Sequence, residues 1–371
     1  MVVPLAARSV IAVAGALLVL TAWGSVIGTL IVPRPAGGWL TRWVDRVINA
    51  AFQMITGSIA DHKRRDRVLA AQAAAILIAQ LVTWLGIFFV GYSLLLWPFV
   101  DTGMGSAFSM ASPGVFGPNA AVGNAEKVLA DLAAFTALVA VTLQIAYLPT
   151  LYSEFNRREN EVSLLNARAG VPSWGPELLA RTHYALGSGA STINTLPDLY
   201  QRWESWAADV AESHTTYLPL VRFRSPRPLS SWVIALLAVL DSAALYLALS
   251  PQSAPVVPAR LCLRSGFQCL AQVARAMDLD ITEAADPAAG ISLSYDEFLD
   301  AVTRMRKVDF PIERDPADAW PDFVGWRVNY EQAAYALAAA VDAVPAMWSG
   351  PRRRRVAAIA PLRPPAGRAP K

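Results

Sequence analysis

Histidine, cysteine and charged residues are scarce in this chain. Its 371 residues include three histidines (His62, His183 and His214) and two cysteines, and 16% of the residues carry a charge. The histidines lie at no metal-ligand spacing, and neither an H-E-x-x-H motif nor a G-x-S-x-G elbow occurs. These absences predict a protein that is not an enzyme and that binds no metal and no cofactor.

The two cysteines exclude an internal disulfide by their spacing. Cys262 and Cys269 are seven residues apart. On a helix this spacing puts them on one face but about 10 Å apart, which is too far for a disulfide bond. We therefore predict two reduced, buried thiols in the cytoplasm.

Apolar residues are abundant and form three long uncharged runs. Hydrophobic side chains make up 54% of the chain, which is typical of a membrane protein. The runs cover residues 9–32, 68–100 and 132–153. Because about 20 apolar residues in a helix cross the hydrocarbon core, we predict three transmembrane helices. The alternative for the first run is a secretory signal, although no A-x-A site ends it.

The basic residues predict an orientation. The segment between the first two runs carries seven cations, whereas residues 101–127 carry one, Lys127. By the positive-inside rule, the first segment is cytoplasmic and residues 101–127 lie outside. We therefore expect a multi-pass protein of the cell (plasma) membrane with its N-terminus outside and its C-terminal domain in the cytoplasm.

The first cytoplasmic segment has the pattern of a helix that lies in the membrane interface. Between Trp39 and Ile55 the apolar residues recur at helical spacing, with polar residues between them. A basic stretch, "HKRRDR" at 62–67, follows. Tryptophans favour the headgroup layer and cations favour anionic headgroups, so the predicted lipid-binding residues are Trp39, Trp43, Lys63, Arg64, Arg65 and Arg67. The alternative is an ordinary amphipathic helix packed on the cytosolic domain.

The C-terminal half predicts a cytosolic helical domain. The apolar run at 229–250 is long enough to be a fourth span, but Asp241 lies at its middle and a crossing would place the later cations outside. We therefore interpret it as a buried helix of a cytosolic bundle. The predicted organisation is all-α, with a membrane domain at 1–155, a helical domain at 156–350 and a disordered basic tail at 351–371.

One irregular insertion, "GSAFSMASPGVFG" at 105–117, lies between the second and third runs. The region 101–127 is where the re-entrant loop of a two-helix pore module would lie. A potassium filter needs a run such as T-x-G-x-G, whose carbonyls replace the water around the ion. The best alignment departs from that run, because Ala111 and Pro113 replace both glycines. The filter-like residues are Ser109, Met110, Ala111, Ser112, Pro113 and Gly114.

Four further blocks carry a resemblance to a known family. They are "LQIAYLPTLYSEFNRRE" at 143–159, "GVPSWGPELLAR" at 170–181, "ESHTTYLPLVRFRSP" at 212–226 and "GWRVNYE" at 325–331. With the order of the spans, they resemble a family of actinobacterial integral membrane proteins described as hypothetical or as potassium-channel-like. The resemblance covers most of the chain and implies a two-helix pore module with a cytosolic helical domain.

Two functions remain open from the sequence. In the first, the pore module forms a homo-oligomer that conducts monovalent cations under control of the cytosolic domain. In the second, the spans anchor a non-conducting helical scaffold that binds a partner. Polar residues within the spans are pore-lining candidates, although helix-to-helix hydrogen bonds are an equal alternative for each: Gln80, Thr83, Thr142 and Gln144. The expected partners are the bilayer and anionic headgroups, and not nucleic acid.

Overall fold

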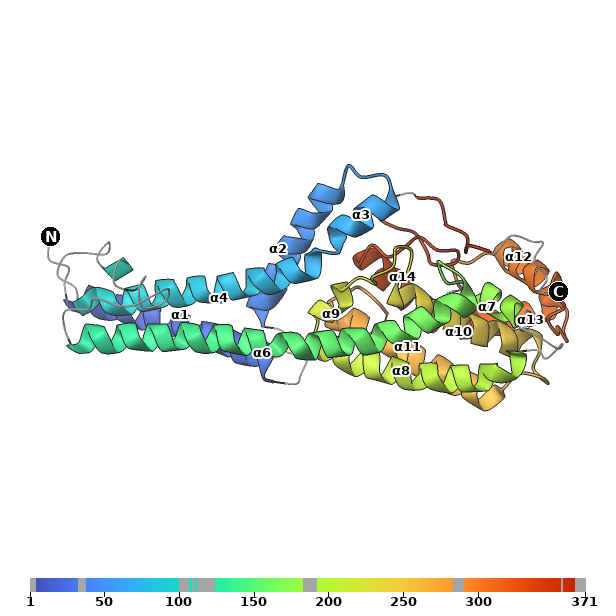
Figure 1. Ribbon diagram of the computed structural model, residues 1–371, viewed down its shortest axis with the longest axis horizontal. Coiled ribbons are helices and arrows are strands. Elements are labelled where there is room, and N and C mark those ends of the chain that lie inside the picture. The colour runs from blue at the N-terminus through green and yellow to red at the C-terminus, as the bar shows by residue number, and fades with distance from the viewer. Residues whose placement is uncertain are drawn as a thin grey trace, which may run out of the picture. The chain divides into compact units, whose positions relative to one another are not determined.

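The computed structural model describes residues 5–32, 38–99, 107–108, 111, 124–182, 192–282, 290–354 and 356–363. The described residues form helices and no strand, which confirms the predicted all-α fold (Figure 1). Four of these helices are long and apolar enough to cross a membrane: Ala7–Leu30, His62–Phe99, Asn124–Ala169 and Trp232–Leu249. This composition is that of a membrane protein.

The chain divides into two compact units. The first unit comprises Met1–Ile59 and Val68–Ser153, and the second comprises Ala60–Arg67 and Glu154–Lys371. The short segment Ala60–Arg67, which the sequence placed in the membrane domain, therefore belongs to the second unit. Two ion pairs explain this assignment: Arg65 pairs with Asp342, and Asp66 pairs with Arg224.

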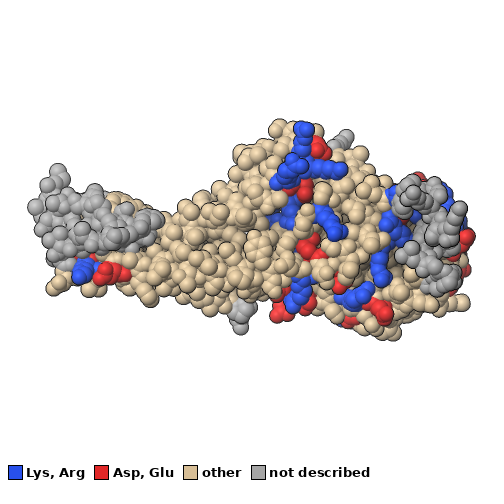
Figure 2. Space-filling view, in the orientation of Figure 1, with Lys and Arg blue, Asp and Glu red and all other residues tan. Residues whose placement is uncertain are grey.

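The first unit is a bundle of long apolar helices. Helices α1 (Leu5–Leu30) and α4 (Gln72–Leu96) pack closely, and α2 (Trp39–Thr56) contacts both; the 3-10 turn η1 (Trp97–Phe99) follows α4. A Cβ added at Gly15 would lie 2.7 Å from the Gly91 carbonyl oxygen, so only glycine permits this close crossing. In Figure 2 the long apolar helices show little charge over most of their length.

Helix α6 (Asn124–Ala169) begins in the first unit and ends in the second. Pro149 lies inside it and has no N–H to donate to the carbonyl of Ile145. The boundary between the units, after Ser153, falls one turn beyond this proline. A helix is most easily bent at such a position.

The second unit is a helical bundle around one central helix, α10 (Trp232–Leu249). Helix α10 packs on α7, α8, α11, α13 and α14, and every one of its residues is buried. Helices α8 and α11 also pack on each other, and α12 contacts α7 and α13. Helix α3 (His62–Leu69) belongs to this unit up to Arg67. The other elements of the unit besides α6 and α10 are α7 (Gly175–Arg181), η2 (Thr192–Thr195), α8 (Leu196–Thr216), α9 (Pro219–Arg222), α11 (Val256–Ala276), α12 (Tyr295–Arg306), α13 (Pro316–Arg327) and α14 (Glu331–Ala340).

The burial of α10 separates it from the other apolar helices. The most apolar stretch of α10 is 100% buried, whereas the most apolar stretches of the other three candidate spans are 28–33% buried. Its neighbours α8 and α11 are amphipathic and keep charged side chains such as Arg202 and Arg264 exposed. The apolar length of α10 is therefore covered by protein, as expected for the centre of a bundle.

The basic tail differs from the prediction. Disorder was expected from Pro351 onward, but residues 351–354 and 356–363 pack on the second unit. Ile359 donates its N–H to Pro345 at 2.7 Å, and Leu362 donates to the Val171 carbonyl at 2.9 Å. The prediction was wrong for these residues because backbone hydrogen bonds fix them, and these bonds leave no apolar periodicity in the sequence. Residues 355 and 364–371 lie outside the described part.

Candidate functional site

The filter-like stretch is described at one position only. Ala111 is fully buried in a small cluster with Ala107 and Leu96, and the Phe108 ring lies 5.5 Å from that of Phe89. These contacts place the described part of the insertion against α4. Five of the six filter-like residues lie outside the described residues: Ser109, Met110, Ser112, Pro113 and Gly114.

The four pore-lining candidates differ in burial. Gln80 and Gln144 are buried in the first unit, and the Oε1 atom of each has no hydrogen-bond partner among the described residues. Thr83 donates to the carbonyl of Ala79 in its own helix. Thr142 faces outward. These positions leave the four residues as pore-lining candidates, as the sequence predicts.

A cluster of buried apolar side chains joins α1, α4 and α6 in the first unit. Large aromatic side chains of α4 pack on small residues of α1 and α6, and their polar atoms are paired. The Trp84 indole donates to Ser25 at 3.0 Å, and the Tyr92 hydroxyl bonds to Thr136 at 2.8 Å. The cluster consists of Ala22, Val26, Leu40, Trp84, Phe88, Tyr92, Ala133, Ala137 and Ala140. A core of this kind holds helices together.

The predicted lipid-binding residues separate into exposed and buried ones. Trp39 and Trp43 on α2 are 63% and 51% exposed, and Lys63, Arg64 and Arg67 on α3 are also exposed. Arg65 is 3% exposed and its Nε lies 2.6 Å from a carboxylate oxygen of Asp342. Arg65 is thus occupied within the second unit, and its assignment to lipid was wrong because its side chain faces inward.

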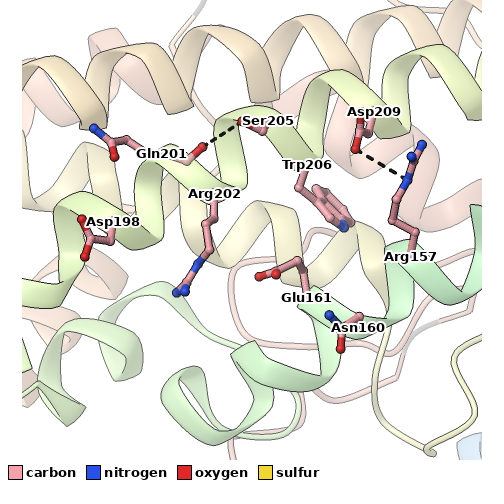
Figure 3. Close-up of a pocket in the computed structure, with 9 residues that line it drawn as sticks. All are labelled: Arg157, Asn160, Glu161, Asp198, Gln201, Arg202, Ser205, Trp206 and Asp209. Carbon is pink, nitrogen blue, oxygen red and sulfur yellow. Dashed lines mark hydrogen bonds and ion pairs between the residues drawn. The ribbon is translucent and has the colours of Figure 1, made fainter.

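A polar groove of about 490 Å³ lies between α6 and α8 in the second unit (Figure 3). Arg202 from α8 and Glu161 from α6 point toward one another across it, over the nearly buried Trp206. The Arg157 side chain lies 3.6 Å from Asp209. The lining residues are Arg157, Asn160, Glu161, Asp198, Gln201, Arg202, Ser205, Trp206 and Asp209. Charges of both signs around an apolar floor suit a polar partner surface better than an apolar small molecule.

Asp241, the charge at the centre of α10, is fully compensated. It accepts from the Arg327 guanidinium at 2.5 Å and from the Tyr330 hydroxyl at 2.8 Å. Arg327 also donates to Glu331 at 2.6 Å and to the Trp348 carbonyl at 2.8 Å. The bonds of this network join α10, α13 and α14. Because its side chains are buried, a substrate has no access to them.

A second buried cluster surrounds Arg158. This guanidinium contacts Glu159 at 2.7 Å and donates to the carbonyls of Leu220 and Phe223, each at 2.8 Å. It also reaches His214 Nε2 at 3.0 Å, so that nitrogen accepts and the ring is neutral. Burial and the Arg158 cation hold the pKa of His214 well below its usual value. The histidine is therefore a hydrogen-bonding part of the core.

A third cluster gathers three arginines around one buried carboxylate. Glu177 lies 3.0 Å from Arg181, 2.8 Å from Arg304 and 3.1 Å from Arg363 of the tail. Burial opposes the charge, but the hydrogen bonds from Arg304 and Arg181 hold the pKa of Glu177 below its usual value. This carboxylate remains ionised and connects α7, α12 and the tail.

The sequence did not predict which buried charges pair with one another. Asp241 was expected to face protein, but its partner Arg327 is 86 positions away and no local pattern connects them. The cysteines behave as predicted, since Cys262 and Cys269 are free and buried. No cluster of three or more His, Cys, Asp or Glu side chains suited to a metal occurs among the described residues.

No family model, no curated protein and no solved structure matches this chain.

Proposed function

We propose that this chain is a membrane-anchored helical protein whose second unit binds a protein partner through the groove between α6 and α8. In this proposal α1, α4 and α6 cross the membrane, and the second unit lies in the cytoplasm. The distribution of basic residues along the sequence supports this orientation.

The observation that carries the anchoring role is the apolar cluster shared by α1, α4 and α6 in the first unit. Trp84, Phe88 and Tyr92 of α4 pack with alanines of α6 in this cluster. The groove supports the binding role because its charged side chains come from two different helices. A surface with this mixture of charges selects partners by electrostatic complementarity.

An oligomeric cation channel is the second candidate. Ala107 and Ala111 are fully buried and pack with Leu96, as a loop that returns into a membrane bundle would. Non-helical backbone at membrane depth persists only when protein or water surrounds it. In this candidate the conducting path forms between copies of the chain.

Ion flux separates the two candidates. The full chain is reconstituted into liposomes, and flux of several monovalent cations is measured with an ionophore as the positive control. We expect no flux from correctly inserted protein. If flux appears, and Ala111→Trp abolishes it without loss of insertion, the channel replaces the anchor.

Partner binding is tested by site-specific cross-linking in cells. A photo-reactive residue at Ser205, in the groove, is compared with one at Thr303, which is exposed on α12. The captured protein is then purified, and its affinity for the full chain is measured. We expect the double reversal Glu161→Lys with Arg202→Glu to weaken binding at least about tenfold, because it exchanges the positions of a positive and a negative charge in the groove. An unchanged affinity would assign the partner to another surface.

A further inference from the structure

Helix α3 has one buried face and one exposed face. His62, Arg65 and Leu69 are buried, whereas Lys63, Arg64 and Arg67 are exposed. The spacing of the exposed cations, i, i+1 and i+4, puts them on one side of the helix. In Figure 2 a group of basic side chains lies over α3.

The charges on the buried face of α3 are compensated. Arg65 forms a two-point contact with Asp342, at 2.6 Å through Nε and 3.1 Å through Nη2. Asp66 accepts from Arg224 at 2.5 Å, and Arg224 also donates to the carbonyls of Val341 and Asp342. The three outward cations are therefore in excess on this helix.

The acidic residue at the start of α3 does not cancel this excess. The Asp61 carboxylate accepts from the backbone N–H groups of Lys63 and Arg64, each at 3.3 Å. An acid in this position compensates the free N–H groups of the first turn. The exposed face with Lys63, Arg64 and Arg67 is therefore positively charged and can bind anions.

The chain places α3 close to a membrane surface. Leu69 ends α3, and the apolar helix α4 begins three residues later, at Gln72. Three residues span at most about 10 Å. If α4 crosses the bilayer, α3 lies at or near the headgroup layer.

Helix α2 gives separate evidence that this part of the sequence binds at a lipid interface. Its exposed side carries a continuous apolar stripe at helical spacing: Trp39, Trp43, Val47, Met54 and Ile55. The opposite side of α2 buries Leu40, Thr41 and Val44 in the first unit. An exposed apolar stripe with two tryptophans, followed by exposed cations, is the composition of an element that binds at a lipid interface.

We propose that α3 is a binding site for anionic phospholipid headgroups, formed by Lys63, Arg64 and Arg67. The proposal rests on the membrane anchoring but is independent of the groove.

The test records which lipid lies next to α3. A photo-reactive residue replaces the exposed Ala60, and the full chain is reconstituted in vesicles of equal phosphatidylglycerol and phosphatidylcholine. Lipid adducts are identified by mass. Three cations near a charged surface favour the anionic lipid on the order of 100-fold, and we expect at least a tenfold excess of phosphatidylglycerol adducts.

Two triple variants make the outcome specific. Lys63→Gln with Arg64→Gln and Arg67→Gln is expected to bring the adduct ratio close to one. Arg264→Gln with Arg306→Gln and Lys307→Gln changes the net charge equally at other exposed positions of the second unit and should leave the ratio unchanged. An equal ratio in the parent chain and the first variant overturns the proposal, as does the absence of lipid adducts at position 60.

A second photo-reactive position distinguishes this failure from failure of the anchor. Leu17 is exposed on α1, so lipid adducts at position 17 report insertion irrespective of headgroup. Adducts at position 17 without a preference at position 60 reject the α3 site alone. Failure of the groove cross-link at Ser205, with the preference at position 60 retained, rejects the partner-binding function alone.

Discussion

At the residue scale, the second unit depends on buried ions that are satisfied from several sides. Arg327 binds two carboxylates, a tyrosine hydroxyl and a backbone carbonyl, and its guanidinium lies over the rings of Tyr335 and Trp348. Such a group adds little net stability compared with an apolar core of the same shape. Removal of one partner, however, leaves an uncompensated buried charge.

Replacement of Arg327 should therefore be severe. Arg327→Met keeps much of the side-chain length but leaves Asp241 and Glu331 without their cation. We expect the free energy of unfolding to fall by about 3–5 kcal/mol, measured by urea unfolding of the detergent-solubilised chain with tryptophan fluorescence. Arg264→Met, at an exposed position, is the matched control and should cost less than about 0.5 kcal/mol. Equal effects of the two variants would contradict a special role for the Asp241 network.

His214 predicts a pH dependence of stability. Its folded pKa lies below its unfolded value, so the unfolded chain binds a proton that the folded chain does not. Stability should thus be intact above about pH 6.5 and fall by about 1.4 kcal/mol per pH unit below it. Urea unfolding of the parent chain and of His214→Gln, between pH 7.5 and 5, measures this slope. The variant should show a shallower decline, and parallel profiles would mean that other groups cause the loss.

The residues of the four sequence blocks gain a physical explanation from these networks. Arg158, His214 and Arg327 each lie in a different block, and Glu177 lies in the remaining one. All four are buried and bonded to residues of other helices. The sequence identified where unusual residues occur, but not which of them meet, because every pairing except those within one helix is long-range.

At the element scale, periodicity predicted where the helices lie in the sequence, but not which elements pack against each helix. The composition of α10 fits a span and a core helix equally, and Asp241 favoured the second interpretation before its partner was known. The close approach of α7 to α10 was not predictable. A Cβ added at Gly175 would lie 2.6 Å from the Cβ of Asp241. Nothing in the local sequence indicates that this glycine is needed for packing.

The tail illustrates an element without any periodic signal. Arg352 is buried and donates to the carbonyls of Ala343, Val344 and Ser349, each at 2.8 Å. A run of four arginines normally indicates a solvated segment. Here one of them closes the loop that follows α14, because the unpaired carbonyls of that loop need donors.

Arg352 and its neighbour Arg354 provide a direct comparison. Arg352→Ala removes the donors to three buried carbonyls, and we expect a loss of about 1–3 kcal/mol in the free energy of unfolding. Arg354→Ala removes the same charge from an exposed position and should change it by less than about 0.5 kcal/mol. Chemical denaturation of both variants makes the measurement. If both arginines tolerate alanine, the bonds from Arg352 do not stabilise the fold.

At the scale of the whole molecule, the division into two units follows composition except at one segment. The apolar runs and the polar, tryptophan-rich helices separate near Ser153, where the sequence becomes charged. The segment Ala60–Arg67 could not be assigned correctly from sequence, because its membership depends on Asp342 and Arg224. Long-range ion pairs override its position between two apolar helices.

The proposed topology makes the last prediction. Three crossings by α1, α4 and α6 put Lys127 outside, and both α3 and the tail inside. Single cysteines at Lys127, Arg64 and Arg354, all exposed positions, are treated in intact cells with a membrane-impermeant maleimide. We expect labelling at position 127 alone, and labelling at all three positions after permeabilisation. The native Cys262 and Cys269 give little background, because burial raises the pKa of both thiols. Labelling of position 354 in intact cells, with position 64 protected, would make α10 a fourth crossing and would require the whole bundle around it to be reassigned.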